Sequence, residues 1–274
     1  KLYASKAKTP MDLINISNIR QGLLTASGLS DKSLKYFNDS DKMDAIKKMI
    51  EEFLLPAGRG FVDELVYRYL LVRGDSLGGS MRNLVGKIAE IKLKRKIFSV
   101  LSMLQVTFKV LFKRNKKSNK WTDLSYEEAF SLADEICAIS WCINELDKVL
   151  FFNMTIPLVR NNVDICLYKG TPATYDSGNI VHSNGDAIMF GELKGGIDPA
   201  GADEHWKTGN TALARIRNAF KGYNIKTSFV GAAIEEKMAE EIFLQLENNT
   251  LSNAANLTYN EHLTNYCEWL VKLQ

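Results

Sequence analysis

Three ionisable residues inside short apolar segments constrain this sequence most. Segment 163–168 is apolar and rich in β-branched residues and holds Asp164, and segment 186–194 ends with Glu192 and Lys194. Short runs of this kind, bounded by Gly, Pro, Asn and Asp, are typical of buried strands. Because charged groups are costly to bury unless they are paired, these residues predict a functional site.

The rest of the chain predicts an α/β fold. A turn-rich stretch over 171–184 joins the two segments, which indicates an antiparallel pair with a long connection. Further elements are expected C-terminal to this pair: helices over 202–220, 235–247 and 261–273 and a third strand over 225–233. The residues before 151 read as mainly helical, over 41–55, 61–72 and 126–149, while 88–112 fits either a helix or two strands. We therefore expect a helical region over 1–150 and an α/β region over 151–274.

Composition excludes several classes of protein. The 274 residues are 46% hydrophobic and 24% charged, which excludes a disordered, collagen-like or disulfide-stapled chain. The four cysteines lack metal-ligand spacing, so we expect reduced, buried thiols in a cytoplasmic protein. The apolar stretch 97–112 contains polar residues and is shorter than the ~20 residues that a membrane span needs. The sequence begins at Lys1 without a methionine, which indicates a trimmed chain.

Charge is unevenly distributed along the chain. The net charge is only +3, but the segment 91–120 holds ten Lys and Arg residues and no acid. One basic segment in an otherwise acidic chain favours a polyanionic partner. The alternative, a solubilising face or an exposed loop, stays open.

The three strand residues have the chemistry of phosphodiester hydrolysis. Glu192 and Lys194 are two residues apart, so their side chains share one face of a strand, ~7 Å apart. Carboxylates of Asp164 and Glu192, with the carbonyl of Leu193, are oxygen ligands that suit Mg²⁺. The cation can polarise a phosphate, and Lys194 can position water and stabilise the developing charge. The spacing predicts a PD-(D/E)xK nuclease core, although Val163 stands where the motif has proline; the alternative is a solvated ion pair.

The residues after Lys194 leave the strand and enter a helix. Glycines in this stretch permit close backbone approach. His205, in the first turn of the helix, can take a proton from an attacking water, although a packing or capping role is the alternative. Lys207 can contact a DNA phosphate.

A Gly-rich segment over 73–82 is expected to form a loop that opens a helix. Its backbone amides, with Arg73 and Arg82, can bind a DNA phosphate. The alternative is that Asp75 and Ser76 cap the following helix. Glu90, further along, is a candidate additional carboxylate for the metal.

The block 192–207, with Asp164 upstream and the segment 73–82, resembles the type II restriction endonucleases of the AvaI/BsoBI group. The resemblance covers most of the chain and is densest over 161–220. It implies a Mg²⁺-dependent homodimer that encloses double-stranded DNA and cuts both strands within a short palindrome, leaving 5′-phosphates. The sequence of the group's site, C-Y-C-G-R-G cut after the first C, is carried over only as a hypothesis.

The resemblance also implies roles for individual residues. Metal binding and catalysis fall to residues already singled out: Asp164, Glu192, Lys194 and His205. Asp198 matches a base-contacting position, where a carboxylate accepts from cytosine N4. Lys32 and Lys35 resemble a basic pair that reads guanine; two exposed helix lysines are the alternative. Residues 1–150 would grip DNA and dimerise. A non-cutting DNA-binding module and a repair or mobile-element nuclease remain alternatives.

Overall fold

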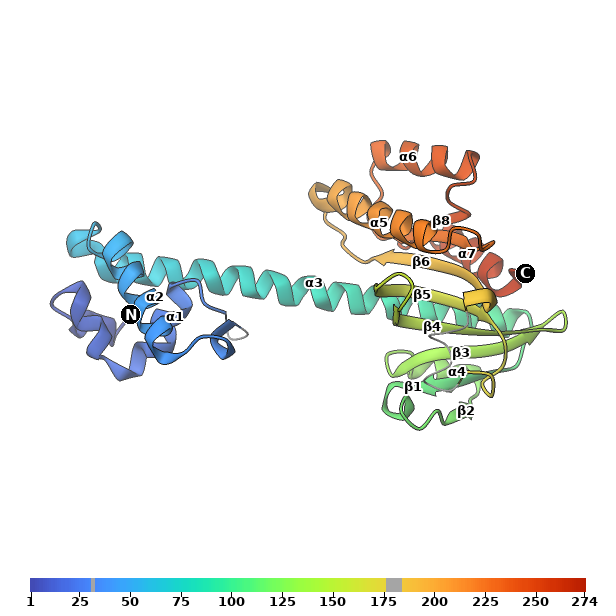
Figure 1. Ribbon diagram of the computed structural model, residues 1–274, viewed down its shortest axis with the longest axis horizontal. Coiled ribbons are helices and arrows are strands. Elements are labelled where there is room, and N and C mark those ends of the chain that lie inside the picture. Colours follow the sequence, from blue (N-terminus) through green and yellow to red (C-terminus); the bar gives the residue numbers. More distant parts are fainter. Residues whose placement is uncertain (31–32, 176–183) are drawn as a thin grey trace. The chain divides into compact units, whose positions relative to one another are not determined.

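The computed structural model describes residues 1–30, 33–175 and 184–274 (Figure 1). The chain forms two compact units, Lys1–Asn83 and Leu84–Gln274, each described by itself. The division falls within the long helix α3 (Phe61–Met103) and differs from the boundary expected after residue 150. The reason is that strands begin as early as Phe108, so the sheet already includes much of the segment expected to be helical.

The first unit is helical. It contains α1 (Arg20–Ala26), α2 (Asp39–Met49) and the first part of α3. Asn38 caps α2, because its Oδ1 accepts from the Asp41 N–H at 2.9 Å. Apolar residues of this unit form a core of their own, which includes Leu13, Leu23, Ile46, Ile50 and Leu54.

Helix α3 is continuous across the segment expected to be a Gly-rich loop. The prediction of a loop over 73–82 is therefore wrong. A glycine inside a helix lowers its stability by about 1 kcal/mol relative to alanine but keeps its N–H donor, and only proline removes it. The uncertain stretch 88–112 is now assigned: the helix extends to Met103, and a strand begins at Phe108.

The second unit is built on one sheet of eight strands, in the order β2-β1-β3-β4-β5-β6-β7-β8. The strands are β1 (Phe108–Phe112), β2 (Trp121–Asp123), β3 (Ile136–Ile143), β4 (Leu146–Ile156), β5 (Asn161–Lys169), β6 (Ala187–Lys194), β7 (Lys226–Gly231) and β8 (Asn253–Asn256). Pairing is antiparallel from β2 through β6 and parallel from β6 through β8. The sheet therefore changes its pairing mode at β6.

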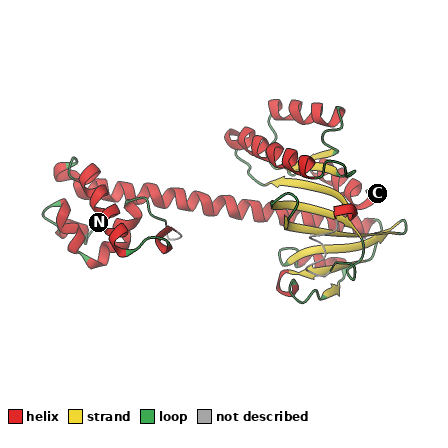
Figure 2. Cartoon of the chain, viewed as in Figure 1, coloured by secondary structure: helices red, strands yellow, loops and turns green. Residues whose placement is uncertain are grey.

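Helices cover both faces of this sheet (Figure 2). The second part of α3 packs on one face with α4 (Tyr126–Ser131) and α7 (Asn260–Lys272), and α5 (Pro199–Ala219) and α6 (Glu236–Glu247) pack on the other. Each face has its own buried apolar cluster. Leu93 and Leu270 belong to the first, and Trp206 and Met238 to the second. The mixed α/β class predicted from the sequence is confirmed.

The helix predicted over 126–149 is wrong beyond its first turns. Helix α4 ends at Ser131, and the chain then forms the β3–β4 hairpin. Asn144 and Glu145 connect the strands with φ values of 51° and 62°. Two left-handed residues between paired strands are typical of a type I′ turn. Because the run Ile136–Trp141 is buried without interruption, its apolar residues did not show a strand-like alternation.

The predictions C-terminal to residue 160 are confirmed more closely. Strands β5 and β6 pair antiparallel, and the third strand and three helices lie where the sequence placed them. Residues 176–183 of the turn-rich connection lie outside the described residues. All four cysteines are free thiols, but Cys142 is exposed rather than buried as expected. Among the described helices, none has the length and apolar character required to cross a membrane.

Candidate active site

The three predicted strand residues meet where the sheet changes from antiparallel to parallel pairing. Strand β5 pairs with β6 only as far as Gly191, whereas β6 continues along β7 to its last residue. Beyond that point the Asp164 carboxylate replaces a backbone partner, and its Oδ2 accepts from the Leu193 N–H at 2.8 Å. Beyond the end of the β5–β6 ladder, the Asp164 carboxylate therefore links the two strands in place of a backbone bond.

Leu193 presents its carbonyl to the same edge. The carbonyl of Lys194 accepts from the Ala232 N–H at 2.9 Å and so points away from β5. Because successive carbonyls in a strand point to opposite edges, the Leu193 carbonyl points toward β5 and Asp164. This arrangement fits the role of oxygen ligand that the sequence suggested for Leu193.

Glu192 and Lys194 form a close pair on β6. Lys194 Nζ lies 2.9 Å from Glu192 Oε2, and the glutamate is only 4% exposed. Burial and the nearby Asp164 carboxylate raise the pKa of Glu192 to about 7. Burial also raises the pKa of Asp164. A buried and a half-buried carboxylate thus repel each other beside Lys194, and an additional cation would relieve that repulsion.

The donor set suits a hard divalent cation. Mg²⁺ is usually held by one or two carboxylates, with water and substrate phosphate completing its shell. Asp164, Glu192 and the Leu193 carbonyl are oxygen donors of this kind. Across residues 1–30, 33–175 and 184–274, no cluster of three or more His, Cys, Asp or Glu side chains is arranged to hold a metal. Three oxygen donors leave the remaining positions of a Mg²⁺ shell to water and substrate phosphate.

Two glycines let the chain pass closely from β6 to α5. A Cβ on Gly195 would lie 2.7 Å from the Ala89 Cβ and 2.8 Å from the Val85 carbonyl oxygen. A Cβ on Gly196 would overlap the imidazole of His205, which is half-buried in α5. The close approach predicted from these glycines is present. His205 is thereby held against the residues that directly follow Lys194.

The predicted DNA-contacting residues near this site are exposed. Asp198 precedes α5, and Lys207 lies on its third turn. Lys207 Nζ makes an ion pair with Asp203 at 2.6 Å, and both side chains are about two-thirds exposed. In contrast, Arg217 is half-buried and donates to the Thr250 carbonyl at 3.4 Å, which gives it a structural contact.

The other predicted DNA contacts belong to the first unit. Lys35 is exposed in the short 3-10 helix Ser33–Lys35, and Arg73 and Arg82 are exposed on α3. Lys32 lies outside the described residues. The structure thus describes these basic residues in a unit separate from the one that holds Asp164.

One polar residue near the site was not identified from the sequence. Asn153 of β4 has a φ of 54°, and the paired residues on either side place it opposite Asp164. Its side chain donates to Glu90. The available signal was a single asparagine within an apolar run, since asparagine tolerates left-handed backbone better than most residues.

Comparison with known proteins agrees with this geometry. The family described as "Restriction endonuclease BsobI" matches residues 1–273. The chain is 49% identical to "Type II restriction enzyme BsoBI" of Geobacillus stearothermophilus, over all of the chain and 85% of that relative. The chain belongs to the BsobI family of restriction endonucleases. It is also 45% identical to "Type II restriction enzyme AvaI" of a Nostoc species, over all of the chain and 86% of that relative. Its enzyme class is that of the type II restriction enzymes.

Proposed function

We propose that this chain is a Mg²⁺-dependent type II restriction endonuclease with a PD-(D/E)xK core, which hydrolyses both strands of DNA within a short palindrome. The observation that carries the proposal is the meeting of Asp164, Glu192 and Lys194 at the end of the β5–β6 ladder. Membership of a restriction endonuclease family supports it. A DNA substrate in the cell also implies a cytoplasmic location.

In this mechanism each residue has a separate task. Asp164, Glu192 and the Leu193 carbonyl would hold Mg²⁺, which would supply Lewis-acid polarisation of the scissile phosphodiester. Lys194, anchored to Glu192, orients the attacking water and stabilises the negative charge that develops on the phosphate oxygens. His205 takes the proton of that water. The water oxygen bonds to phosphorus as the bond to the 3′ oxygen breaks, so the products are a 5′-phosphate and a 3′-hydroxyl.

DNA recognition is proposed to use both units. A palindromic cut requires two active sites related by a two-fold axis, and a homodimer supplies them. Asp198 accepts from a cytosine N4, whereas Lys32 and Lys35 reach guanine. Phosphate contacts come from three exposed basic residues: Lys207, Arg73 and Arg82. The first unit would then grip DNA and dimerise, and the site C-Y-C-G-R-G is the sequence to test.

A digest of long, sequenced, unmethylated DNA, with and without Mg²⁺, tests this function. Mapping the fragment ends should give discrete, Mg²⁺-dependent ends that align on one palindrome. A smear of random ends would instead indicate a nuclease without sequence specificity. Absence of cleavage by a folded protein that still binds DNA would indicate a non-cutting DNA-binding module.

The site assignment is tested separately with variants of its carboxylates and lysine. We expect Asp164→Asn, Glu192→Gln and Lys194→Ala to abolish cleavage while Ca²⁺-supported DNA binding persists, because these residues act on the phosphate rather than on the bases. Near-normal cutting by any of the three would contradict the assignment.

A further inference from the structure

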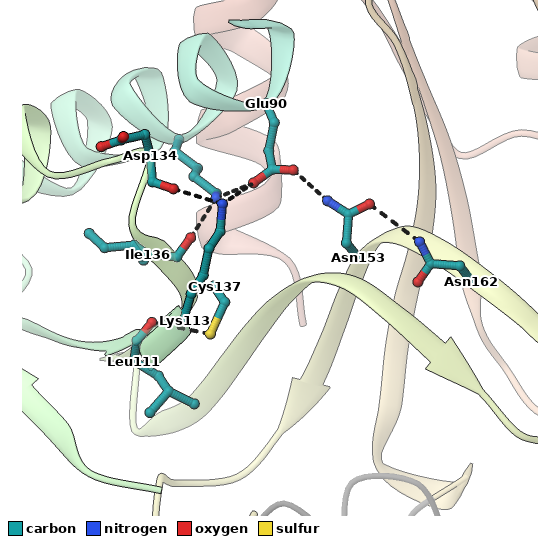
Figure 3. Close-up of polar contacts among 9 residues, drawn as sticks. Glu90, Leu111, Lys113, Asp134, Ile136, Cys137, Asn153 and Asn162 are labelled. Carbon is teal, nitrogen blue, oxygen red and sulfur yellow. Dashed lines mark hydrogen bonds and ion pairs between the residues drawn. The ribbon is translucent and has the colours of Figure 1, made fainter. Parts of the chain in front are cut away.

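A polar network is centred on Glu90 of α3 (Figure 3). One oxygen of this carboxylate accepts from Lys94 Nζ and the other from Asn153 Nδ2. Lys113 Nζ lies 4.0 Å from the first oxygen. Both oxygens of Glu90 are therefore engaged by neighbouring side chains, so the residue is bound as a structural centre rather than presented as an open metal ligand.

Lys94 is the buried anchor of this network. Its side chain is 0% exposed, and its Nζ also donates to the Ile136 carbonyl at 2.5 Å and lies 4.7 Å from the ring centroid of Phe152. Burial lowers the pKa of Lys94, and the Glu90 carboxylate counteracts that shift. A buried ammonium group without its carboxylate would be strongly destabilising. The pair therefore ties the position of Glu90 on α3 to strand β3.

Asn153 is the other end of the network. Its backbone is left-handed, with φ of 54°, a conformation that costs most L residues about 1–2 kcal/mol. Glu90 holds its amide nitrogen, and its amide oxygen accepts from Asn162 Nδ2 at 3.3 Å. Both ends of the side chain are thus fixed, and they fix this unusual backbone conformation of β4.

The left-handed residue lies opposite Asp164. The β4–β5 register pairs the residues on either side of Asn153 but not Asn153 itself. At the same level, β5 separates from β6, and Asp164 turns its carboxylate to the Leu193 N–H. Burial, and to a smaller degree the charge of Glu90, raise the pKa of Asp164, which is consistent with the proximity of the two carboxylates. The conformation of β4 therefore bears directly on the position of this carboxylate.

We propose that Glu90, Lys94 and Asn153 form a positioning network for Asp164: Lys94 fixes Glu90, Glu90 fixes Asn153, and Asn153 fixes the strand geometry that places the Asp164 carboxylate for metal binding. The inference rests on the proposed function of Asp164. It differs from direct metal binding by Glu90, because it requires the hydrogen bond between Glu90 and Asn153 rather than the negative charge at position 90.

An exchange of the two partners separates these roles. In Glu90→Gln the new amide has only one acceptor oxygen, so its NH₂ group would face a second donor, either Lys94 Nζ or Asn153 Nδ2. In Asn153→Asp two carboxylates would face each other. In the double variant, the amide introduced at position 90 accepts from Lys94 and donates to the new carboxylate at position 153, which still accepts from Asn162. The total charge and the hydrogen-bond chain are both restored.

The measurement is the single-turnover cleavage rate of prebound DNA as a function of Mg²⁺ concentration. We expect each single variant to raise the half-activating concentration by about 10–100-fold, as is usual when residues that orient a metal ligand are changed. The double variant should return to within a few-fold of wild type. A thermal unfolding scan of each protein verifies that it is folded.

Two results would overturn the network. One is wild-type Mg²⁺ dependence in both single variants. The other is a double variant that unfolds at the wild-type temperature but is as impaired as Glu90→Gln alone, which would indicate that Glu90 binds the metal directly. Asp164→Asn provides the separate control for the proposed function. Normal cutting by this variant would contradict the assignment of the active site itself. An inactive Asp164→Asn, together with normal Mg²⁺ dependence in Glu90→Gln and Asn153→Asp, would contradict only the positioning network.

Discussion

His205 shows how a single side chain can be tested independently of the metal site. The structure holds its imidazole against Gly196, two residues beyond Lys194. We expect His205→Ala to lower the cleavage rate at neutral pH by roughly 10²–10⁴-fold, the usual contribution of a general base. The measurement is a pH–rate profile at saturating Mg²⁺.

A matched control for this prediction is His262→Ala. His262 is exposed on α7 and contacts the ring of Tyr259. Its removal should leave the profile unchanged. An unaltered profile in His205→Ala would assign His205 to packing instead.

Lys148 shows a buried charge with a structural role. Its side chain is buried on β4, and its Nζ donates to the Val271 carbonyl at 2.8 Å, near the C-terminus of α7. Trp141 Nε1 donates to the same carbonyl at 3.2 Å. Cations are favoured at this end of a helix, so the lysine and the tryptophan together attach α7 to the sheet.

The stability contributed by Lys148 should depend on pH. Burial lowers its pKa to about 8 from the usual 10.5. Between these values the unfolded chain binds the proton and the folded chain does not, so this group makes the free energy of unfolding rise with pH. Below pH 8 the folded state bears the full penalty of the buried charge.

We therefore expect the free energy of unfolding of Lys148→Met, relative to that of wild type, to be highest at pH 7. This difference should fall as the pH rises toward 10, where the wild-type lysine is neutral in the folded state. Urea unfolding of both proteins at pH 7 and at pH 10 measures the difference, and Trp141 keeps one donor on the Val271 carbonyl in the variant. An equal difference at the two pH values would contradict the assignment of the shifted pKa to Lys148.

At the scale of elements, the β3–β4 hairpin is stabilised by its strands despite an unfavourable turn. Glu145 adopts a φ of 62°, where glycine is favoured and glutamate is strained. We expect Glu145→Gly to raise the free energy of unfolding by about 0.5–1 kcal/mol. The matched control is Glu240→Gly in the exposed middle of α6, which should lower it by about 1 kcal/mol. Destabilisation by both changes would contradict the type I′ assignment.

The sequence predicted elements well where its apolar pattern was local and regular. Segments 163–168 and 186–194 are bounded by turn residues, and both became strands that pair as expected. It failed at β3, where an uninterrupted apolar run resembles a buried helix and the turn lacks glycine. It failed again at 73–82, because five of the ten residues are Gly or Ser but their helix persists as part of α3.

At the scale of the whole molecule, the residues of the candidate site were predictable from their types. The residues that surround and position them were not. Asp164, Glu192 and Lys194 are conspicuous because charge is rare within apolar strands. Asn153 is inconspicuous, since its proposed role depends on the register of β4 against β5, which no local pattern encodes. Tertiary pairing is therefore the information that the sequence pattern lacked.

The structure also changes the interpretation of the basic segment 91–120 as a binding surface for a polyanion. Several of its bases have partners within the second unit: Lys94 with Glu90, Lys96 with Asn260, Lys109 with Asp123, Lys113 with the Asp134 carbonyl, and Arg114 with Glu135. Lys94 is fully buried and is not available to a polyanion. The exposed pairs of Lys109 and Arg114 are weak, so these two bases can exchange their partners for a phosphate.

Lys207 is a sharper test of DNA electrostatics than the basic segment. It lies on α5 near the candidate site, and its ion pair with Asp203 is exposed. Such surface pairs contribute only about 0–1 kcal/mol, so the lysine can exchange its partner for a phosphate. If it does, Lys207→Gln should lower the slope of log affinity against log salt by about one unit, since one fewer counterion is released.

The matched control is Lys272→Gln. Lys272 makes an equivalent pair with Glu268 one turn earlier on α7, which packs on the opposite face of the sheet. Equilibrium binding of a specific duplex, in Ca²⁺ and at several salt concentrations, should give the wild-type slope for Lys272→Gln. An equal slope for Lys207→Gln would mean that Asp203 retains Lys207 in the complex. Asp203→Asn provides the reciprocal test: by releasing the lysine it should tighten DNA binding at low salt, an effect that screening by added salt would remove.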